Sequence, residues 1–197
     1  MSSAPSRSSR DPLAAARAAA VARTVEAVRA VGATNPVVLI DGRSGAGKTT
    51  FARELVAQWP LRGRVQAVAL DSLYPGWDGL ADGVEAARTQ ILVPHARGMI
   101  GVWQRWDWDS STYAEASAVD PALPLILEGS GILTPVTARL SDVRVWVNAP
   151  ADARKRRALD RDGDGFRPHW TRWAEQEERH VSRDDPQGQA TLTFDFP

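Results

Sequence analysis

Residues 37–50 read VVLIDGRSGAGKTT, and this stretch decides the fold. Its first four residues are apolar and β-branched or aliphatic, which is typical of a buried parallel strand. They lead directly into GRSGAGKT, which matches the pattern GxxxxGK[ST], and a stretch with helical periodicity follows. A strand, a glycine-rich loop and a helix in this order predict backbone amides that face phosphate oxygens at a helix N-terminus.

The loop contains the groups that a magnesium triphosphate requires. Glycines let the backbone curl around the phosphates, Lys48 brings a positive charge to the β- and γ-phosphates, and the Thr49 hydroxyl can reach Mg²⁺. We therefore predict that ATP and Mg²⁺ are the cofactors. The residues predicted to bind the nucleotide are Gly42, Ser44, Gly45, Ala46, Gly47, Lys48, Thr49 and Thr50.

The remainder of the chain alternates short apolar runs with amphipathic stretches, which indicates parallel strands joined by crossover helices. The fold class predicted is therefore α/β, a three-layer α/β/α sandwich with a parallel P-loop kinase sheet and a short lid. A last apolar run at residues 192–196 is either a strand or a docked tail. Further strands are predicted at 65–70, 125–127 and 143–147, and helices at 48–58, 80–98, 151–160 and 168–182.

Length and composition limit the organisation of the chain. With 197 residues it is long enough for one domain and too short for two ordinary ones. We predict a disordered tail at residues 1–12 and a single P-loop kinase domain at 13–197, which begins with a packed helix at 13–31. The net charge of zero argues against nucleic acid as a partner. The absence of cysteine and of a long apolar run leads us to expect a cytoplasmic protein without membrane contact, as a monomer or homodimer.

Two carboxylates follow predicted strands, where open α/β sheets bind ligands. Asp71 could accept the proton of an attacking hydroxyl and help to hold Mg²⁺, although it could instead cap the following turn. Glu128 stands where an acid reaches Mg²⁺ through water in such sites, although it could simply be an exposed residue at a strand end. The predicted metal-binding residues are thus Thr49, Asp71 and Glu128.

Arginines recur at helical spacing in ARKRRALDRD, residues 153–162. Arg154, Arg157 and Arg161 share one face of the predicted helix, and arginines that close over a migrating phosphoryl group stabilise its charge. The segment Gly163-Asp164-Gly165 that follows suits a moving lid. A solvated basic face is the alternative interpretation.

These pieces together resemble the uridine kinase-like branch of small P-loop kinases. The residues that carry the resemblance are IDGRSGAGKTTFA, DSLY at 71–74, WDW at 106–108, LILEGSGIL at 125–133 and RRALDRD at 156–162, in the family's order. The resemblance implies that Asp71 is the catalytic base, that Glu128 assists Mg²⁺, and that Arg157 and Arg161 contact phosphates. With Lys48 these form the predicted catalytic set. Only about thirty residues separate DSLY from WDW, so we expect the hairpin that surrounds a pyrimidine to be absent.

The acceptor side is predicted from the remaining motif residues. Tyr74, Asp78, Trp106 and Asp107 are the candidates for substrate binding, with Asp78 a possible ribose ligand. Tryptophans gather in the same segments, and they either stack on a flat substrate or build the core. The three histidines show no metal-ligand spacing, and we assign them surface or capping roles. They are His95, His169 and His180.

We expect an ATP-dependent kinase that transfers the γ-phosphoryl group to a hydroxyl of a small molecule, nucleoside-like or another metabolite. The sequence contains neither the guanine-reading NKxD of GTPases nor the LSGGQ of ABC ATPases. Two alternatives stay open. A nucleoside monophosphate kinase would need an arginine-rich acceptor pocket, and a non-catalytic ATP-binding regulatory module would bind ATP without turnover.

Overall fold

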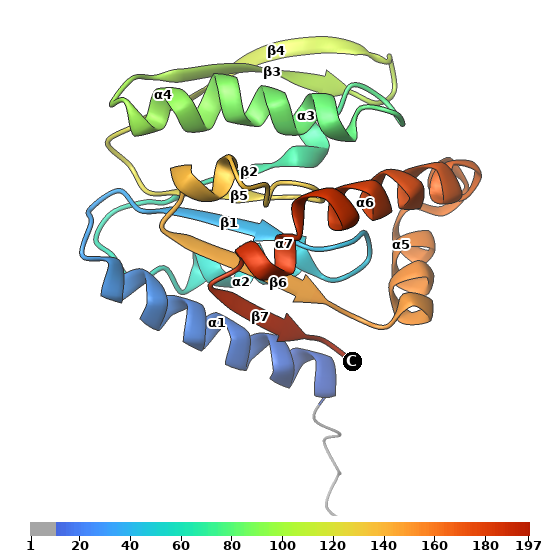
Figure 1. Ribbon diagram of the computed structural model, residues 1–197, viewed down its shortest axis with the longest axis horizontal. Helices are drawn as coiled ribbons and strands as arrows, with labels where there is room; N and C mark the ends of the chain where they lie inside the picture. Colours follow the sequence, from blue (N-terminus) through green and yellow to red (C-terminus); the bar gives the residue numbers. More distant parts are fainter. Residues whose placement is uncertain (1–10) are drawn as a thin grey trace, which may run out of the picture.

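A five-stranded parallel sheet forms the centre of the computed structural model, which describes residues 11–197 (Figure 1). Its strand order is β2-β5-β1-β6-β7, and all four neighbouring pairs are parallel. Residues 192–195 of the last apolar run therefore form a strand that pairs with β6. The strands are β1 (Val37–Asp41), β2 (Gln66–Ala69), β5 (Leu125–Glu128), β6 (Val143–Asn148) and β7 (Leu192–Asp195).

Helices cover both faces of the sheet, which confirms the predicted three-layer α/β/α sandwich (Figure 1). One face packs on α1 (Pro12–Val31) and α2 (Lys48–Ala57), which an ion pair between Arg17 and Glu54 also joins. The other face packs on a long helical layer and on α6 (Trp170–Asp184). That layer consists of α3 (Leu80–Ala86), the π-helical segment η2 (Ala87–Leu92) and α4 (Val93–Ala96).

An antiparallel hairpin lies on the far side of this helical layer from the sheet (Figure 1). It consists of β3 (Gly101–Asp107) and β4 (Thr112–Val119), and Trp103 and Val119 anchor it in the core. The sequence predicted no base-binding hairpin between DSLY and WDW, and it did not predict this later one. The hairpin begins only after the helix, and it contains the WDW motif instead of preceding it.

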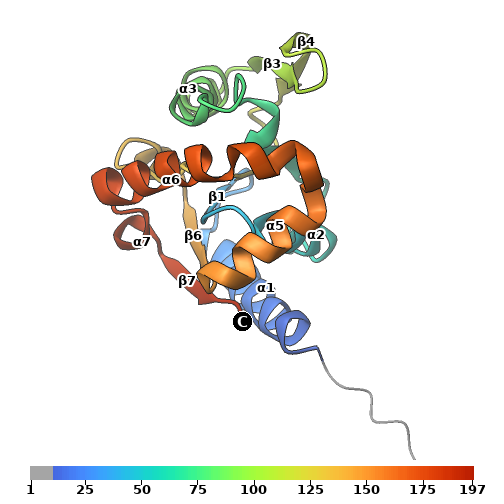
Figure 2. The ribbon, with the colours of Figure 1, turned by 90° about the vertical axis from the view of Figure 1, so that its right-hand side faces the viewer.

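The chain then crosses the carboxyl ends of the strands (Figure 2). Helix α5 (Ala151–Phe166) has a kink at Gly163, whose φ of +58° and ψ of −135° are not helical. The short turn η4 (Arg167–His169) leads into α6, which lies in front of β1 and β6 in Figure 2. The remaining elements are η1 (Leu70–Ser72), η3 (Thr137–Leu140) and α7 (Pro186–Gln189).

The start of α1 corrects the predicted tail at residues 1–12. The Asp11 side chain accepts a hydrogen bond from the Leu13 amide at 3.0 Å, and Pro12 begins the helix. Both residues therefore belong to the helix start, where an aspartate cap and an early proline are favourable. Residues 1–10 lie outside the described residues. Within residues 11–197, no helix has the length and apolar character needed to span a bilayer.

Candidate functional site

The glycine-rich loop connects β1 to α2 and passes close beneath α5. Gly45 has a φ of +76°, and a Cβ atom there would collide with the backbone carbonyl of Arg154. Only glycine fits a left-handed conformation with so close a neighbour. The Arg154 guanidinium in turn donates to the Ser44 carbonyl at 3.3 Å, and Arg157 donates to the Gly45 carbonyl at 2.9 Å. Two arginines of α5 thus hold the carbonyl oxygens outward from the loop.

A cavity of about 200 Å³ lies in the curl of this loop. Lys48 reaches into the loop, where its ammonium donates to the Gly42 carbonyl at 2.6 Å and to the Ser130 hydroxyl at 3.2 Å. The cavity lies at the N-terminus of α2, where free amides favour an anion. The loop thus has the shape and charge of a phosphate cradle. Its lining includes Ser44, Gly45, Gly47, Lys48, Thr49, Thr50, Asp71, Glu128, Arg157 and Arg161.

The two predicted carboxylates reach the same cavity. Glu128 is the last residue of β5 and is only 6% exposed. Burial raises the pKa of Glu128, an effect that Asp71 reinforces and that Lys48, Thr49 and Arg161 oppose. Asp71 lies in the single turn η1 after β2 and is exposed to the cavity.

The residues of the cradle suit Mg²⁺ that is bound together with phosphates and water. Within residues 11–197, no three acidic or histidine side chains form a metal cluster. The Thr49 hydroxyl and the carboxylates of Glu128 and Asp71 all line the cradle. Such a set suits Mg²⁺, which keeps several waters and binds through one or two carboxylates together with substrate phosphates.

The two predicted lid arginines both line the cradle but differ in their contacts. Arg157 is tied to the loop and to the Pro197 carbonyl at 2.8 Å, and its Nη2 atom is buried without a partner among the described residues. Arg161 forms a two-bonded ion pair with Asp162 at 2.7 and 2.6 Å. Asp162 is therefore the group that an incoming phosphate would have to replace as the partner of Arg161.

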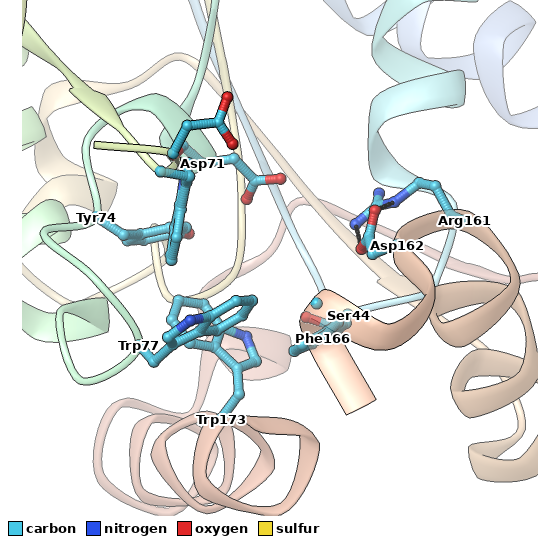
Figure 3. A pocket seen from close by; sticks show the side chains of 11 residues that line it. Ser44, Asp71, Tyr74, Trp77, Arg161, Asp162, Phe166 and Trp173 are labelled. Atoms are coloured by element: carbon cyan, nitrogen blue, oxygen red, sulfur yellow. Dashed lines mark hydrogen bonds and ion pairs between the residues drawn. The ribbon is translucent and has the colours of Figure 1, made fainter. Parts of the chain in front are cut away.

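A second cavity of about 560 Å³ adjoins the cradle, and five aromatic side chains line it (Figure 3). Trp77 lies at their centre, 4.7 Å from Trp108, 5.3 Å from Phe166 and 6.4 Å from Trp173 between ring centroids. In Figure 3, Arg161 and Asp162 lie across the cavity from Asp71. The aromatic cavity and the cradle share Ser44, Asp71 and Arg161.

The structure shifts the predicted acceptor residues along the hairpin. Asp107 accepts a hydrogen bond from Ser110 at 2.7 Å within the hairpin turn, and Trp106 packs edge-on against Tyr113 at 5.1 Å. Neither lines the aromatic cavity. The next two residues do so instead, and the Trp108 indole also donates to the Asp71 carbonyl at 2.8 Å. Trp108 and Asp109 lie in the turn after β3, beyond the strand itself, so the motif indicated the right region but not the residues that line the cavity.

Of the other two residues predicted to bind the acceptor, Tyr74 lines the aromatic cavity and Asp78 does not. Tyr74 lines the aromatic cavity with its ring, and its hydroxyl donates to the Ser130 carbonyl at 2.7 Å. Burial and then the charge of Asp71 raise the pKa of Tyr74. Asp78 points elsewhere and pairs with Arg172 of α6 on the surface. A ribose contact from Asp78 stays a prediction that this geometry does not support.

Two buried groups of α6 were missed by the sequence reasoning. Glu177 is 2% exposed and accepts a hydrogen bond from the Ser44 amide at 2.7 Å. His180 is 4% exposed and lies between Asp184 at 2.9 Å and Asp41 at 3.0 Å. The assignment of His180 to a surface or capping role was therefore wrong. Helical periodicity in residues 168–182 was the available signal, because it places positions 173, 177 and 180 on one inward face.

The parallel sheet, the glycine loop after β1 and the carboxylate at the end of β5 define a P-loop kinase fold. No family model matches the sequence. The chain is 32% identical over 144 residues to the uridine kinase of Brevibacillus brevis, which covers 65% of this chain and 67% of that protein. It is 29% identical over 143 residues to the uridine kinase of Lactobacillus johnsonii, covering 64% and 68%. The chain belongs to the uridine kinase-like P-loop kinases.

Solved structures show the same fold. A possible uridine kinase from Bacillus stearothermophilus superposes with a TM-score of 0.68 at 18% identity, covering 90% of this chain and 98% of that one. A putative fructose transport system kinase from Silicibacter sp. TM1040 superposes with a TM-score of 0.55 at 17% identity, covering 88% and 98%. At such identities the likeness concerns the fold, while the relatives' names support a kinase-like function.

Proposed function

We propose that this protein is an ATP-dependent kinase that transfers the γ-phosphoryl group to a hydroxyl of a small molecule with a flat ring, such as a nucleoside. One observation carries the proposal: Asp71 lines both the phosphate cradle and the aromatic cavity. A carboxylate at the junction can accept the proton of a hydroxyl that enters from the aromatic side. The family membership supports the same reaction type.

The cradle contains a residue for each contact that MgATP is predicted to need. The loop amides and Lys48 would hold the β- and γ-phosphates, and Thr49 with Glu128 and Asp71 would hold Mg²⁺. The metal ion would supply charge stabilisation for the transferring group. Arg161 lies close enough to both cavities to stabilise the same charge once it leaves Asp162.

The acceptor is recognised mainly by ring contacts. Trp77, Trp108 and Trp173 offer broad apolar faces to a planar group. Among the residues that line the aromatic cavity, Arg161 is the sole arginine, and it is paired with Asp162. A nucleoside monophosphate would bring a phosphate that this lining does not neutralise. We therefore favour an acceptor without phosphate over a nucleoside monophosphate.

Replacing the carboxylate of Asp71 tests the proposal. We expect Asp71→Asn to retain MgATP binding but to lower acceptor-dependent ADP release by about 100-fold or more, because general-base catalysis contributes that much. ADP release is measured over a panel of nucleosides, vitamin precursors and sugar-like alcohols, with calorimetry for MgATP. Asp109→Asn is the matched control, since Asp109 lines the aromatic cavity but not the cradle. It should raise the KM of the acceptor and leave kcat close to wild type.

Two results would count against the proposal. Unchanged ADP release in Asp71→Asn would remove Asp71 as the base. MgATP binding without ADP release from any acceptor in the panel would favour the non-catalytic regulatory module.

A further inference from the structure

Three side chains of helix α6 contact the phosphate loop and β1, the strand that precedes the loop. Glu178 pairs with the Arg43 side chain at 2.5 Å, Glu177 accepts from the Ser44 amide at 2.7 Å, and His180 contacts Asp41 at 3.0 Å. The Glu178 pair lies on the surface, with the glutamate side chain 59% exposed. The Glu177 contact is different in kind, because it is buried and reaches the backbone of the loop itself.

One oxygen of Glu177 serves three donors from three parts of the chain. Oε1 accepts from the Ser44 amide, from the Ser130 hydroxyl at 2.9 Å and from the Trp173 indole at 3.1 Å. The Lys48 ammonium donates to the same Ser130 hydroxyl at 3.2 Å. A buried carboxylate is stable only with such donors, and charged acceptors form the stronger hydrogen bonds. Lys48 and Trp173 are therefore linked through Ser130 and Glu177.

The two ends of this link belong to different cavities. Lys48 lines the cradle and not the aromatic cavity, whereas Trp173 lines the aromatic cavity and not the cradle. Ser44 lines both. The Trp173 ring also packs edge-on against Tyr74 at 4.9 Å and Trp77 at 6.4 Å. A change in the hydrogen bond of the Trp173 indole therefore acts on the wall that would receive the acceptor.

We propose that Glu177 is a positioning residue that couples occupancy of the phosphate cradle to the acceptor wall at Trp173. The inference rests on the proposed function, since it takes the cradle as the MgATP site. A triphosphate attracts the Lys48 ammonium away from Ser130 and repels the Glu177 carboxylate. Because Oε1 is shared, weaker donation from Ser44 and Ser130 shifts it toward the Trp173 indole. A contiguous network of this kind can carry coupling between two sites.

MgATP alone can test this coupling, through calorimetry for affinity and tryptophan emission for the state of Trp173. The part of the emission change that is due to Trp173 is the difference between the wild type and Trp173→Phe. In Glu177→Gln we expect this part to fall to about half or less, while the MgATP affinity stays within about threefold of wild type. Glu178→Gln is the matched control on the same helix and should keep both values.

A second variant covers the case in which Glu177→Gln does not fold. Ser130→Ala leaves the carboxylate in place but breaks its link to Lys48, and it should reduce the Trp173 emission change in the same way. An undiminished emission change in either folded variant overturns the coupling. So does a loss of MgATP affinity of about tenfold or more in Glu177→Gln, because the carboxylate would then only shape the loop.

The outcomes for the wild-type protein separate the two proposals. Absence of a binding heat for MgATP would contradict the proposed function and the coupling with it. A normal binding heat without any emission change from Trp173 would contradict the coupling alone.

Discussion

Gly45 is a residue of the phosphate loop that lies directly against the backbone of α5. A methyl group there would meet the Arg154 carbonyl, and the φ of +76° adds backbone strain. We expect Gly45→Ala to lower the free energy of unfolding by about 3 kcal/mol, measured by urea denaturation. Gly63→Ala is the control, since Gly63 has a φ of +86° but no neighbour within 4 Å. An equal loss in both variants would mean that the contact with Arg154 costs nothing.

His180 is a buried residue that contacts Asp41 of β1 and Asp184 of its own helix α6. Burial lowers the pKa of His180, but its bonds to Asp41 and Asp184 outweigh this effect and leave the pKa raised. A raised pKa in the folded state means that the stabilisation is complete below about pH 6.5 and is lost as pH rises through the folded-state value.

The pH dependence of stability checks this role. We expect the unfolding free energy of the wild type to fall as pH increases above about 6.5, and that of His180→Gln to vary less over the same range. Urea denaturation at a series of pH values measures both. Asp184 has a lowered pKa, from its bonds to Arg183 and His180 against the effect of burial. Its contribution is lost only in acid, so it does not overlap this range. Equal slopes for the two proteins would contradict the role of His180.

The sequence predicted the roles of site residues that belong to a local motif. It did not predict the roles of residues whose partners are distant in the sequence. Lys48 and Glu128 belong to local patterns of strand, loop and helix, and both reach the cradle. Glu177 meets a partner 133 positions away and His180 one 139 positions away. Local spacing does not specify such pairs. The sequence of α6 therefore predicts a charged amphipathic helix, but not the partners of its buried residues.

At the scale of elements, α5 has a kink at Gly163 before η4 leads into α6. Its φ of +58° and ψ of −135° suit only glycine, whereas Gly165 has an ordinary helical backbone. Neither glycine has a neighbour within 4 Å of an added methyl group, so packing does not distinguish them. We expect Gly163→Ala to lower the unfolding free energy by about 2 kcal/mol and Gly165→Ala to raise it by up to about 1 kcal/mol. Changes of the same sign in urea denaturation would show that the kink is not under backbone constraint.

The hairpin illustrates how an element escapes prediction. The segment 80–98 was correctly predicted as helical, and counting the residues before WDW left no room for two strands. The strands start only at Gly101, and β3 is buried at alternate positions just at its beginning. A register irregularity between Gln104 and Trp106 breaks the period of two that marks a strand. Trp106 and Asp107 were therefore assigned to the right region, but the residues that line the cavity are Trp108 and Asp109 in the turn that follows β3.

At the scale of the whole molecule, β7 and Phe196 directly after it pack against α2 and the phosphate loop. Phe194 and Phe196 pack against Phe51 of α2 at 5.9 and 6.3 Å, and the Phe196 ring also lies beside Gly47. We expect Phe196→Ala to lower the unfolding free energy by about 3–5 kcal/mol and to weaken MgATP binding as well. Phe194→Ala should cost similar stability without the loss of affinity in calorimetry. Unchanged affinity in Phe196→Ala would limit Phe196 to a stabilising role.

The contact between Phe196 and Gly47 makes the phosphate loop a product of tertiary folding. Segments about three quarters of the chain apart must meet before the loop has its final wall, so loop-closure entropy has to be overcome first. A nascent chain that has exposed only its first hundred residues carries the complete motif but not the complete cradle. We therefore expect nucleotide affinity to arise late, with the docking of β7, and a peptide of the motif alone to lack it.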